Sequence, residues 1–140
     1  MKANLTFLMV FAIIACQSSK KEAPDSIQNA FKKLHPNATI LQWNDESPVW
    51  EAKYEDGNEK GAVSFDENVE ITETELVIAE DQLPKPLSVI NFIKANYPDE
   101  KIKGCEKITK ANGTVTYEIQ ITGKELVFDS SGKFLEEEAD

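Results

Sequence analysis

PDSIQNAFKKLHPNATI, residues 24–40, and PLSVINFIKANYPDEKI, residues 86–102, are two related stretches of the same chain. They share six of seventeen positions, which are Pro24/Pro86, Ser26/Ser88, Asn29/Asn91, Lys32/Lys94, Pro36/Pro98 and Ile40/Ile102. Unrelated stretches of this length would share about one. The identities therefore indicate an internal duplication with an offset of 62 residues.

Each copy is predicted to begin with a helix. The apolar residues of the first copy recur at the i, i+3, i+4, i+7 spacing of one helical face, namely at Ile27, Ala30, Phe31 and Leu34. The second copy keeps this frame with Val89, Phe92 and Ile93. Pro36 disfavours helical geometry at His35, and Pro98 does the same at Tyr97, so both helices are expected to end there.

After each predicted helix the apolar period changes to two, which is typical of strands. In the second copy the alternating apolar positions are Val115, Tyr117, Ile119 and Ile121, and in the first they are Trp50, Ala52 and Tyr54. Turn sequences such as Asp56-Gly57 and Asn112-Gly113 separate these runs. We therefore expect an α+β fold of two tandem repeats, residues 24–80 and 81–140, each with one helix on about four antiparallel strands. A unit of this size is marginal alone, so the repeats either pack together or share one continuous sheet.

The N-terminus resembles a bacterial export signal. Lys2 supplies a positive start, and residues 5–15 (LTFLMVFAIIA) are apolar apart from Thr6, yet number about half of the ~20 residues that span a bilayer. Ile13-Ile14-Ala15-Cys16 resembles a lipobox, which predicts a lipoprotein signal peptide over residues 1–15 and lipidation of Cys16. The alternative is an ordinary secretory signal, whose cleavage site would need a small residue where Ile13 stands.

Cleavage before Cys16 would leave 125 residues with a net charge of -11, against -10 for the whole chain. Residues 16–23 would then form the lipidated cysteine and a flexible polar tether. Cys105 would be the only remaining thiol, which excludes an intramolecular disulfide in the mature chain.

Composition excludes one class of partner. All fifteen basic residues are lysines, and acidic residues outnumber them at twenty-five. Without arginine there is no bidentate fork for phosphates or guanine edges, and an acidic surface repels a polyanion. We therefore expect no nucleic-acid binding.

Both copies contain a recurring pattern of aromatic, proline and acidic residues. In the first copy it consists of Pro24, Ile27, Phe31, Pro36, Trp43, Trp50-Glu51-Ala52-x-Tyr54 and Val63-x-Phe65-Asp66, and in the second it includes Tyr117-Glu118 and Leu126-x-Phe128-Asp129. This pattern resembles the PepSY-like, beta-lactamase-inhibitor-like (BLIP-like) domains of Bacteroidetes-type envelope proteins. The resemblance covers nearly all of the chain from Pro24 onward. It implies a helix on a four-stranded antiparallel sheet per repeat, a secreted or lipid-anchored protein, no established catalytic residues and a binding or inhibitory role. The chain departs from the pattern at Cys105, where the first repeat has Trp43, and at Asn68-Val69, where a turn glycine is common.

No familiar catalytic or metal-binding constellation is present in the sequence. His35 is the only histidine, which excludes a histidine triad or a multi-histidine metal site within one chain, so a packing or helix-terminal role is expected. Cys105 is expected to be a small buried hydrophobe. Asp66-Glu67-Asn68 and Asp129-Ser130-Ser131 offer too few oxygens for a calcium loop and coincide with hairpin turns. Glu73 and Glu75 are expected on a solvated face with no reason for a raised pKa. The chain is therefore expected not to be an enzyme, and no cofactor or metal site is predicted.

Surface recognition remains as the expected activity. The polar face of the predicted sheet offers an acidic docking surface made of Glu51, Lys53, Glu55, Glu118 and Gln120. Trp43 would anchor an interface if exposed, although it fits a core position equally well; Trp50 is expected in the core. We expect a lipid-anchored outer-membrane protein, on the periplasmic side or the cell surface, that binds an envelope protein and inhibits or modulates a hydrolase. The alternative is an accessory or sensor of an envelope system that binds a small molecule or a cation.

Overall fold

The computed structural model describes residues 21–139, which form an α+β fold. The first half contains α1 (Asp25–Leu34), β1 (Thr39–Glu46), β2 (Val49–Asp56), β3 (Glu59–Phe65) and β4 (Ile71–Val77). A short 3-10 helix, η1 (Glu80–Gln82), leads to α2 (Pro86–Asn96), β5 (Gly104–Lys110), β6 (Val115–Ile121), β7 (Lys124–Asp129) and β8 (Phe134–Ala139). The predicted signal segment and Cys16 lie outside the described residues.

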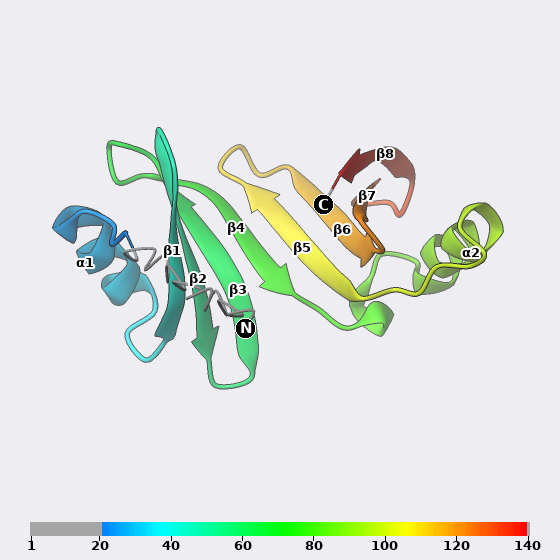
Figure 1. The fold of residues 1–140 in the computed structure, drawn as a ribbon, viewed down its shortest axis with the longest axis horizontal. Helices are drawn as coiled ribbons and strands as arrows, with labels where there is room; N and C mark the ends of the chain where they lie inside the picture. The colour runs from blue at the N-terminus through cyan, green and yellow to red at the C-terminus, as the bar shows by residue number, and fades with distance from the viewer. Residues whose placement is uncertain (1–20, 140) are drawn as a thin grey trace, which may run out of the picture.

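All eight strands belong to one antiparallel sheet in sequence order, from β1 at one edge to β8 at the other (Figure 1). The two halves meet where β4 pairs with β5, from Glu73 opposite Lys110 to Val77 opposite Glu106. Of the two arrangements expected from the sequence, the structure therefore has the continuous sheet. The duplication itself stays a prediction.

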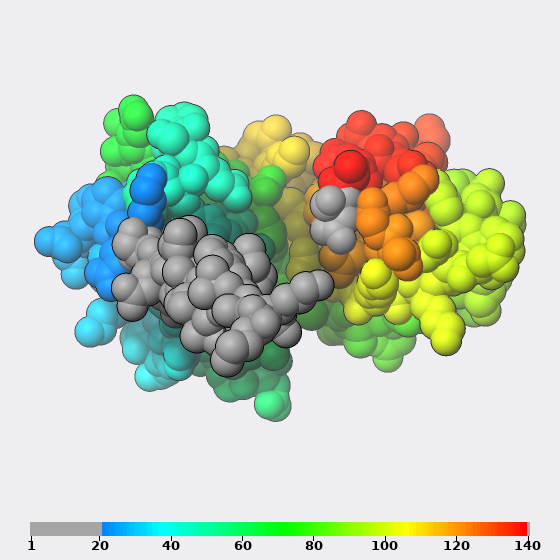
Figure 2. All heavy atoms as spheres, viewed as in Figure 1, coloured from blue at the N-terminus to red at the C-terminus, as the bar shows by residue number. Residues whose placement is uncertain are grey.

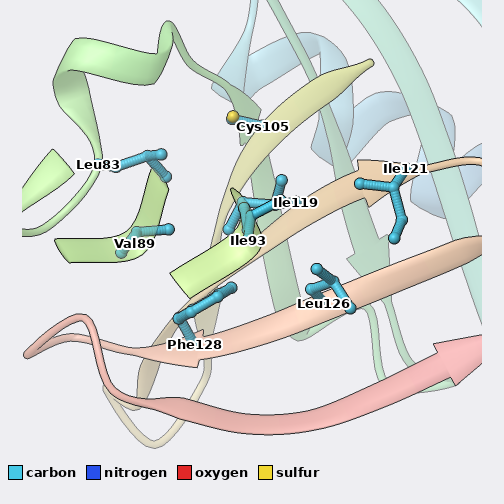
Figure 3. Packing of buried hydrophobic residues seen from close by; sticks show 8 residues of the cluster. All are labelled: Leu83, Val89, Ile93, Cys105, Ile119, Ile121, Leu126 and Phe128. Atoms are coloured by element: carbon cyan, nitrogen blue, oxygen red, sulfur yellow. The ribbon is translucent and has the colours of Figure 1, made fainter. Parts of the chain in front are cut away.

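The sheet has a separate hydrophobic core under each helix. Ile27 and Phe31 of α1 are buried against residues of β2 and β3, which are Ala52, Tyr54, Val63 and Phe65. Val89 and Ile93 of α2 are buried with Leu83 against residues of β5, β6 and β7, which are Cys105, Ile119, Ile121, Leu126 and Phe128 (Figure 3). Figure 2 shows the two helices at opposite ends of the long axis, α1 in blue and α2 in lime.

One expected core residue lies outside these cores. Leu34, the last residue of α1, is 45% exposed. The next residue, His35, packs on the sheet instead. The centroid of its ring lies 4.3 Å from that of Tyr54 and 5.3 Å from that of Phe31. His35 also caps α1 by donating its backbone N–H to the Phe31 carbonyl at 2.8 Å. The packing and helix-terminal role predicted for His35 is thus confirmed, whereas burial of Leu34 is wrong.

The two faces of the sheet differ in what covers them. Residues opposite one another in an antiparallel pair have side chains on the same face. Tyr54, Gly61, Leu76, Lys107 and Tyr117 therefore share the face on which the helices pack. Glu51, Ser64 and Glu73 share the opposite face, which we call the helix-free face. No helix of residues 21–139 packs on it.

Candidate functional site

Glutamates from four strands gather on the helix-free face. Glu51 of β2 lies across from Ser64, which lies across from Glu73 of β4. Glu75 of β4 lies between Ala62 and Ile108. Val77 is opposite Glu106 of β5, which is opposite Glu118 of β6. We call Glu51, Glu73, Glu75, Glu106 and Glu118 the carboxylate patch.

Apolar side chains lie among these carboxylates and form the floor of a groove. Ala62, Val77 and Leu41 are the aliphatic residues of its lining, and Ala62 is only 3% exposed. Ile108 lies opposite Glu75 on the same face but outside the lining, and it is 2% exposed. The groove has a volume of about 360 Å³ and is lined from β1 across to β7. Carboxylates on its walls come from Glu75, Glu106, Glu118 and Glu125. The face is therefore a hollow of mixed character, with an aliphatic floor and acidic walls.

Glu51 is the most buried member of the carboxylate patch, at 6% exposed. Asn44 of the neighbouring strand β1 donates a hydrogen bond from its Nδ2 to Oε1 of Glu51 at 2.7 Å. The Nζ of Lys53, two residues along β2, lies 3.6 Å from the same oxygen. Lys53 is half exposed, so the Asn44 amide is the partner that fixes the Glu51 side chain.

Glu75 has lost much of its hydration in the centre of the sheet. Burial, followed by the negative charges of Glu51, Glu106, Glu73 and Glu118, raises the pKa of Glu75 from its ordinary value of 4.5 to about 7. The sequence reading of Glu73 and Glu75 as solvated carboxylates without a raised pKa was therefore wrong. A carboxyl group in this position exchanges its proton near neutral pH.

Glu118 on β6 behaves in the same way. Burial, and then the charges of Glu125, Glu138, Glu106 and Glu73, raise the pKa of Glu118 to about 7. Burial also raises the pKa of Glu73, and the nearby Lys110 opposes that change. Three carboxylates of the patch are thus raised in pKa, with loss of hydration as the largest cause for each.

The structure brings together part of the predicted docking surface. Lys53, Glu118 and Gln120 line the groove, and Glu51 shares its face. Glu55 lies at the far end of β2, where it forms an ion pair with Lys60. Trp43 is on the other face, since it lies opposite Ala52 and packs edge-on against Phe31 with ring centroids 6.0 Å apart. Trp43 and Trp50 are both half buried at the margin of the α1 core.

Sequence reasoning missed the central members of the patch. The sequence pattern does not distinguish Glu106, and it predicts that Glu73 and Glu75 lie on a solvated face. The alternation Glu73-Thr74-Glu75 placed both carboxylates on one side of a strand, but not in the middle of a sheet. Their burial follows from the β4–β5 pairing, which sets Ile108 beside Glu75.

Two other residues with chemical potential have structural roles. Cys105 is 2% exposed in the α2 core, as expected, and its burial, with the charges of Glu80 and Glu106, raises its pKa to about 11. Asp66 uses its Oδ1 to accept backbone N–H bonds from Asn68 at 2.8 Å and Glu70 at 2.9 Å. Asp129 does the same for Ser131 and Lys133 in the β7–β8 turn. These carboxylates stabilise hairpin turns.

No three histidine, cysteine, aspartate or glutamate side chains of residues 21–139 lie together in a way that could hold a metal ion. No helix within residues 21–139 has the length and apolar character of a membrane span.

Comparison with known proteins identifies relatives of this fold. A family profile described as "Putative beta-lactamase-inhibitor-like, PepSY-like" matches residues 49–136. No functionally curated protein gives a significant match. A BLIP-like protein from Bacteroides fragilis is 24% identical with a TM-score of 0.64, and the alignment covers 86% of this chain and 89% of that one.

Two further solved structures have the same fold. One, described as a "putative periplasmic" protein from Bacteroides eggerthii, has a TM-score of 0.72 at 20% identity, covering 85% of this chain and 90% of that one. The other, a DUF2874 family protein from Bacteroides uniformis, has a TM-score of 0.70 at 17% identity, covering 84% and 90%.

Proposed function

Because the chain belongs to the PepSY-like, beta-lactamase-inhibitor-like family, we propose that it is a non-catalytic binding protein of the bacterial cell envelope whose helix-free face is its interaction surface. The observation that carries this proposal is the groove on that face, where half-buried glutamates surround an aliphatic floor. An apolar centre surrounded by a polar rim is typical of protein interfaces. The partner we favour is a hydrolase that the bound chain inhibits or modulates.

A substitution that fills the groove tests this proposal. Val77 lines the groove and is 46% exposed, so Val77→Arg places a bulky cation there without disturbing a core. Leu87→Arg is the matched control, because Leu87 is 78% exposed on α2, away from the groove. The unsubstituted chain and Leu87→Arg should capture the same saturable partner from envelope extracts, and Val77→Arg should not. Equal capture by Val77→Arg would exclude the groove as the interaction surface.

Inhibition of a hydrolase needs its own measurement. The family description suggests purified β-lactamases as the first panel, assayed by hydrolysis of a chromogenic cephalosporin. We expect a saturable fall in rate with the unsubstituted chain and with Leu87→Arg, and none with Val77→Arg. Inhibition that is equal for all three proteins would show that the effect does not pass through the groove.

Lipid anchoring through Cys16 is a separate part of the proposal. Support comes from the apolar run of residues 5–15 followed by Ala15-Cys16. Cys16→Ser should abolish fractionation with membranes, while Cys105→Ser should leave it unchanged because Cys105 is buried in a core. A Cys16→Ser chain that still floats with membranes would contradict the anchor.

The second candidate function is binding of a small molecule or a cation. The groove volume of about 360 Å³ favours it, since small-molecule sites occupy roughly 300–1,000 Å³. A thermal-shift screen separates the two functions, because a small ligand of the folded state raises the melting temperature in the absence of any protein partner. A ligand whose effect is lost in Val77→Arg and kept in Leu87→Arg would establish this second function.

A further inference from the structure

The groove on the helix-free face has two chemical layers. Its aliphatic part consists of the buried Ala62 and the partly exposed Leu41 and Val77. Its walls present the carboxylates of Glu75 and Glu118, which come from strands on either side of β5. A side chain that fits both layers needs an aliphatic stem and a cationic head, and only lysine and arginine combine the two.

Two lysines, Lys53 and Lys60, line the groove, and each is paired with a glutamate outside the lining. On this face, among residues 21–139, the two ion pairs are Lys53 with Glu51 and Lys60 with Glu55. No lysine of that range lies within ion-pair distance of Glu75, Glu106 or Glu118. Burial, and after it the repulsion from neighbouring carboxylates, raises the pKa of Glu75 and of Glu118 to about 7. A cation entering the groove relieves this repulsion, which makes the face complementary to positive charge.

We propose that the groove binds a basic segment of a partner protein, with a lysine or arginine stem on Ala62 and Val77 and its charged head between Glu75 and Glu118. This inference rests on the proposed function and names the chemistry of the partner. Arginine fits best, because its planar guanidinium can donate to two carboxylates at once and loses hydration more readily than an ammonium group.

Other occupants fit the same face less well. A second copy would set one acidic face against another in a chain whose net charge is -10, and like charges across an interface oppose association. A bound metal ion would need several ligands converging on one point, and no such group is found within residues 21–139.

A defined peptide tests the inference without a known partner. The probe is a fluorescently labelled hexapeptide of alternating arginine and glycine, and its control carries citrulline, which has the shape of arginine without the charge. Anisotropy is measured with the purified full chain at about pH 8 and at an ionic strength of about 20 mM, where electrostatic attraction is weakly screened. We expect saturable binding of the arginine peptide, none of the citrulline peptide, and competition by the unlabelled arginine peptide.

Charge-neutralising variants locate the site. Glu75→Gln with Glu118→Gln should weaken binding of the arginine peptide about tenfold or more. Glu67→Gln removes the same kind of charge from an exposed position in the β3–β4 turn and should leave affinity within about twofold. Equal weakening by Glu67→Gln would overturn the inference, because attraction would then come from net charge alone. Calcium that displaces the peptide stoichiometrically at micromolar concentration would overturn it in favour of a cation site.

The outcomes also separate this inference from the proposed function. If Val77→Arg blocks partner capture while the Glu75→Gln/Glu118→Gln chain captures normally and no arginine peptide binds, the interaction surface stands and the basic segment is wrong. If Val77→Arg captures its partner normally, the interaction surface itself is wrong.

Discussion

A Cβ atom added to Gly61 of β3 would overlap the backbone carbonyl oxygen of Glu75 on β4. The Tyr54 hydroxyl, on the strand at the other side of Gly61, lies 3.2 Å from the same point. Backbone oxygen on one side and an aromatic side chain on the other thus require glycine at this position. The contact also fixes how closely β3 approaches the strand that carries Glu73 and Glu75.

We expect Gly61→Ala to be strongly destabilising. The added methyl group must push β4 away from β3, which would cost about 2–3 kcal/mol or more of unfolding free energy. Gly104→Ala on β5 is the matched control, since the nearest atom to its Cβ is the flexible Gln120 side chain at 3.8 Å. Urea denaturation of both variants checks the prediction, and equal midpoints would show that the β3–β4 contact can relax.

We expect Asn44→Ala to leave the Glu51 carboxylate without its hydrogen-bond donor. Glu51 is 6% exposed, so water cannot fully replace the 2.7 Å bond from Asn44 Nδ2. Loss of a donor to a buried carboxylate costs about 1–3 kcal/mol. Asn58→Ala, at an exposed position in the β2–β3 turn, controls for the substitution itself. A combined Asn44→Ala/Glu51→Gln chain should be less destabilised than the sum of the single variants, and simple additivity would contradict the assigned contact.

We expect the protein to be more stable in mildly acidic solution than in mildly alkaline solution. Glu75 and Glu118 have pKa values raised to about 7, so the folded state holds their protons more tightly than the unfolded chain does. Their contribution to stability is therefore fully present below the ordinary pKa of 4.5 and is lost as the pH rises through 7. Carboxylates with lowered pKa, such as Asp66 and Asp129, act in the opposite direction only at more acidic pH.

Melting temperatures at about pH 5.5 and about pH 8 measure this effect. With solvent screening allowed for, the two glutamates account for about 1–2 kcal/mol, or a few degrees. The Glu75→Gln/Glu118→Gln chain should melt higher than the unsubstituted chain at the alkaline pH and show a flatter pH dependence. The Glu67→Gln control should keep the full dependence. A higher melting temperature at the alkaline pH than at the acidic pH would contradict the prediction.

We expect the Cys105 thiol to be inert in the folded protein. Burial raises its pKa to about 11, and its side chain lies among Ile119, Val89 and the rest of the α2 core. In a Cys16→Ser background, Ellman's reagent should react with Cys105 only at the rate of unfolding, and at once in denaturant. Ser130→Cys, in the exposed β7–β8 turn, should react immediately in the folded state. Fast labelling of Cys105 without denaturant would show that this core opens readily.

Local patterns in the sequence were sufficient to predict the elements of the fold. The spacing of Ile27 and Phe31 predicted the buried stripe of α1, and the alternation ending in Ile119 and Ile121 predicted the buried side of β6. Such patterns depend on the geometry of a single element, in which side chains three to four residues apart on a helix, or two apart on a strand, share one side. The prediction that Leu34 is buried was wrong because the helix ends at this residue, and a residue in the last turn need not face the core.

The chemistry of the site depends on pairings between distant strands. Glu51 and Glu118 were predicted on the polar face, but the special environment of Glu75 arises from Ile108, thirty-three residues away along the chain. Periodicity indicates which side of a strand a carboxylate occupies, but not whether the strand is central or at an edge. A solvated glutamate and one with a pKa of about 7 therefore look the same in sequence.

The β4–β5 pairing is the boundary, or seam, between the two halves of the molecule. The two hydrophobic cores do not merge, so across this seam the halves are held mainly by one ladder of backbone hydrogen bonds. Separate cores open as separate cooperative units unless something couples them. The groove crosses the seam, with lining residues from β1 to β7, so any occupant contacts both units at once. A bound partner would then couple the unfolding of the two halves. The most slowly exchanging amides of both halves would exchange with solvent in a single concerted opening.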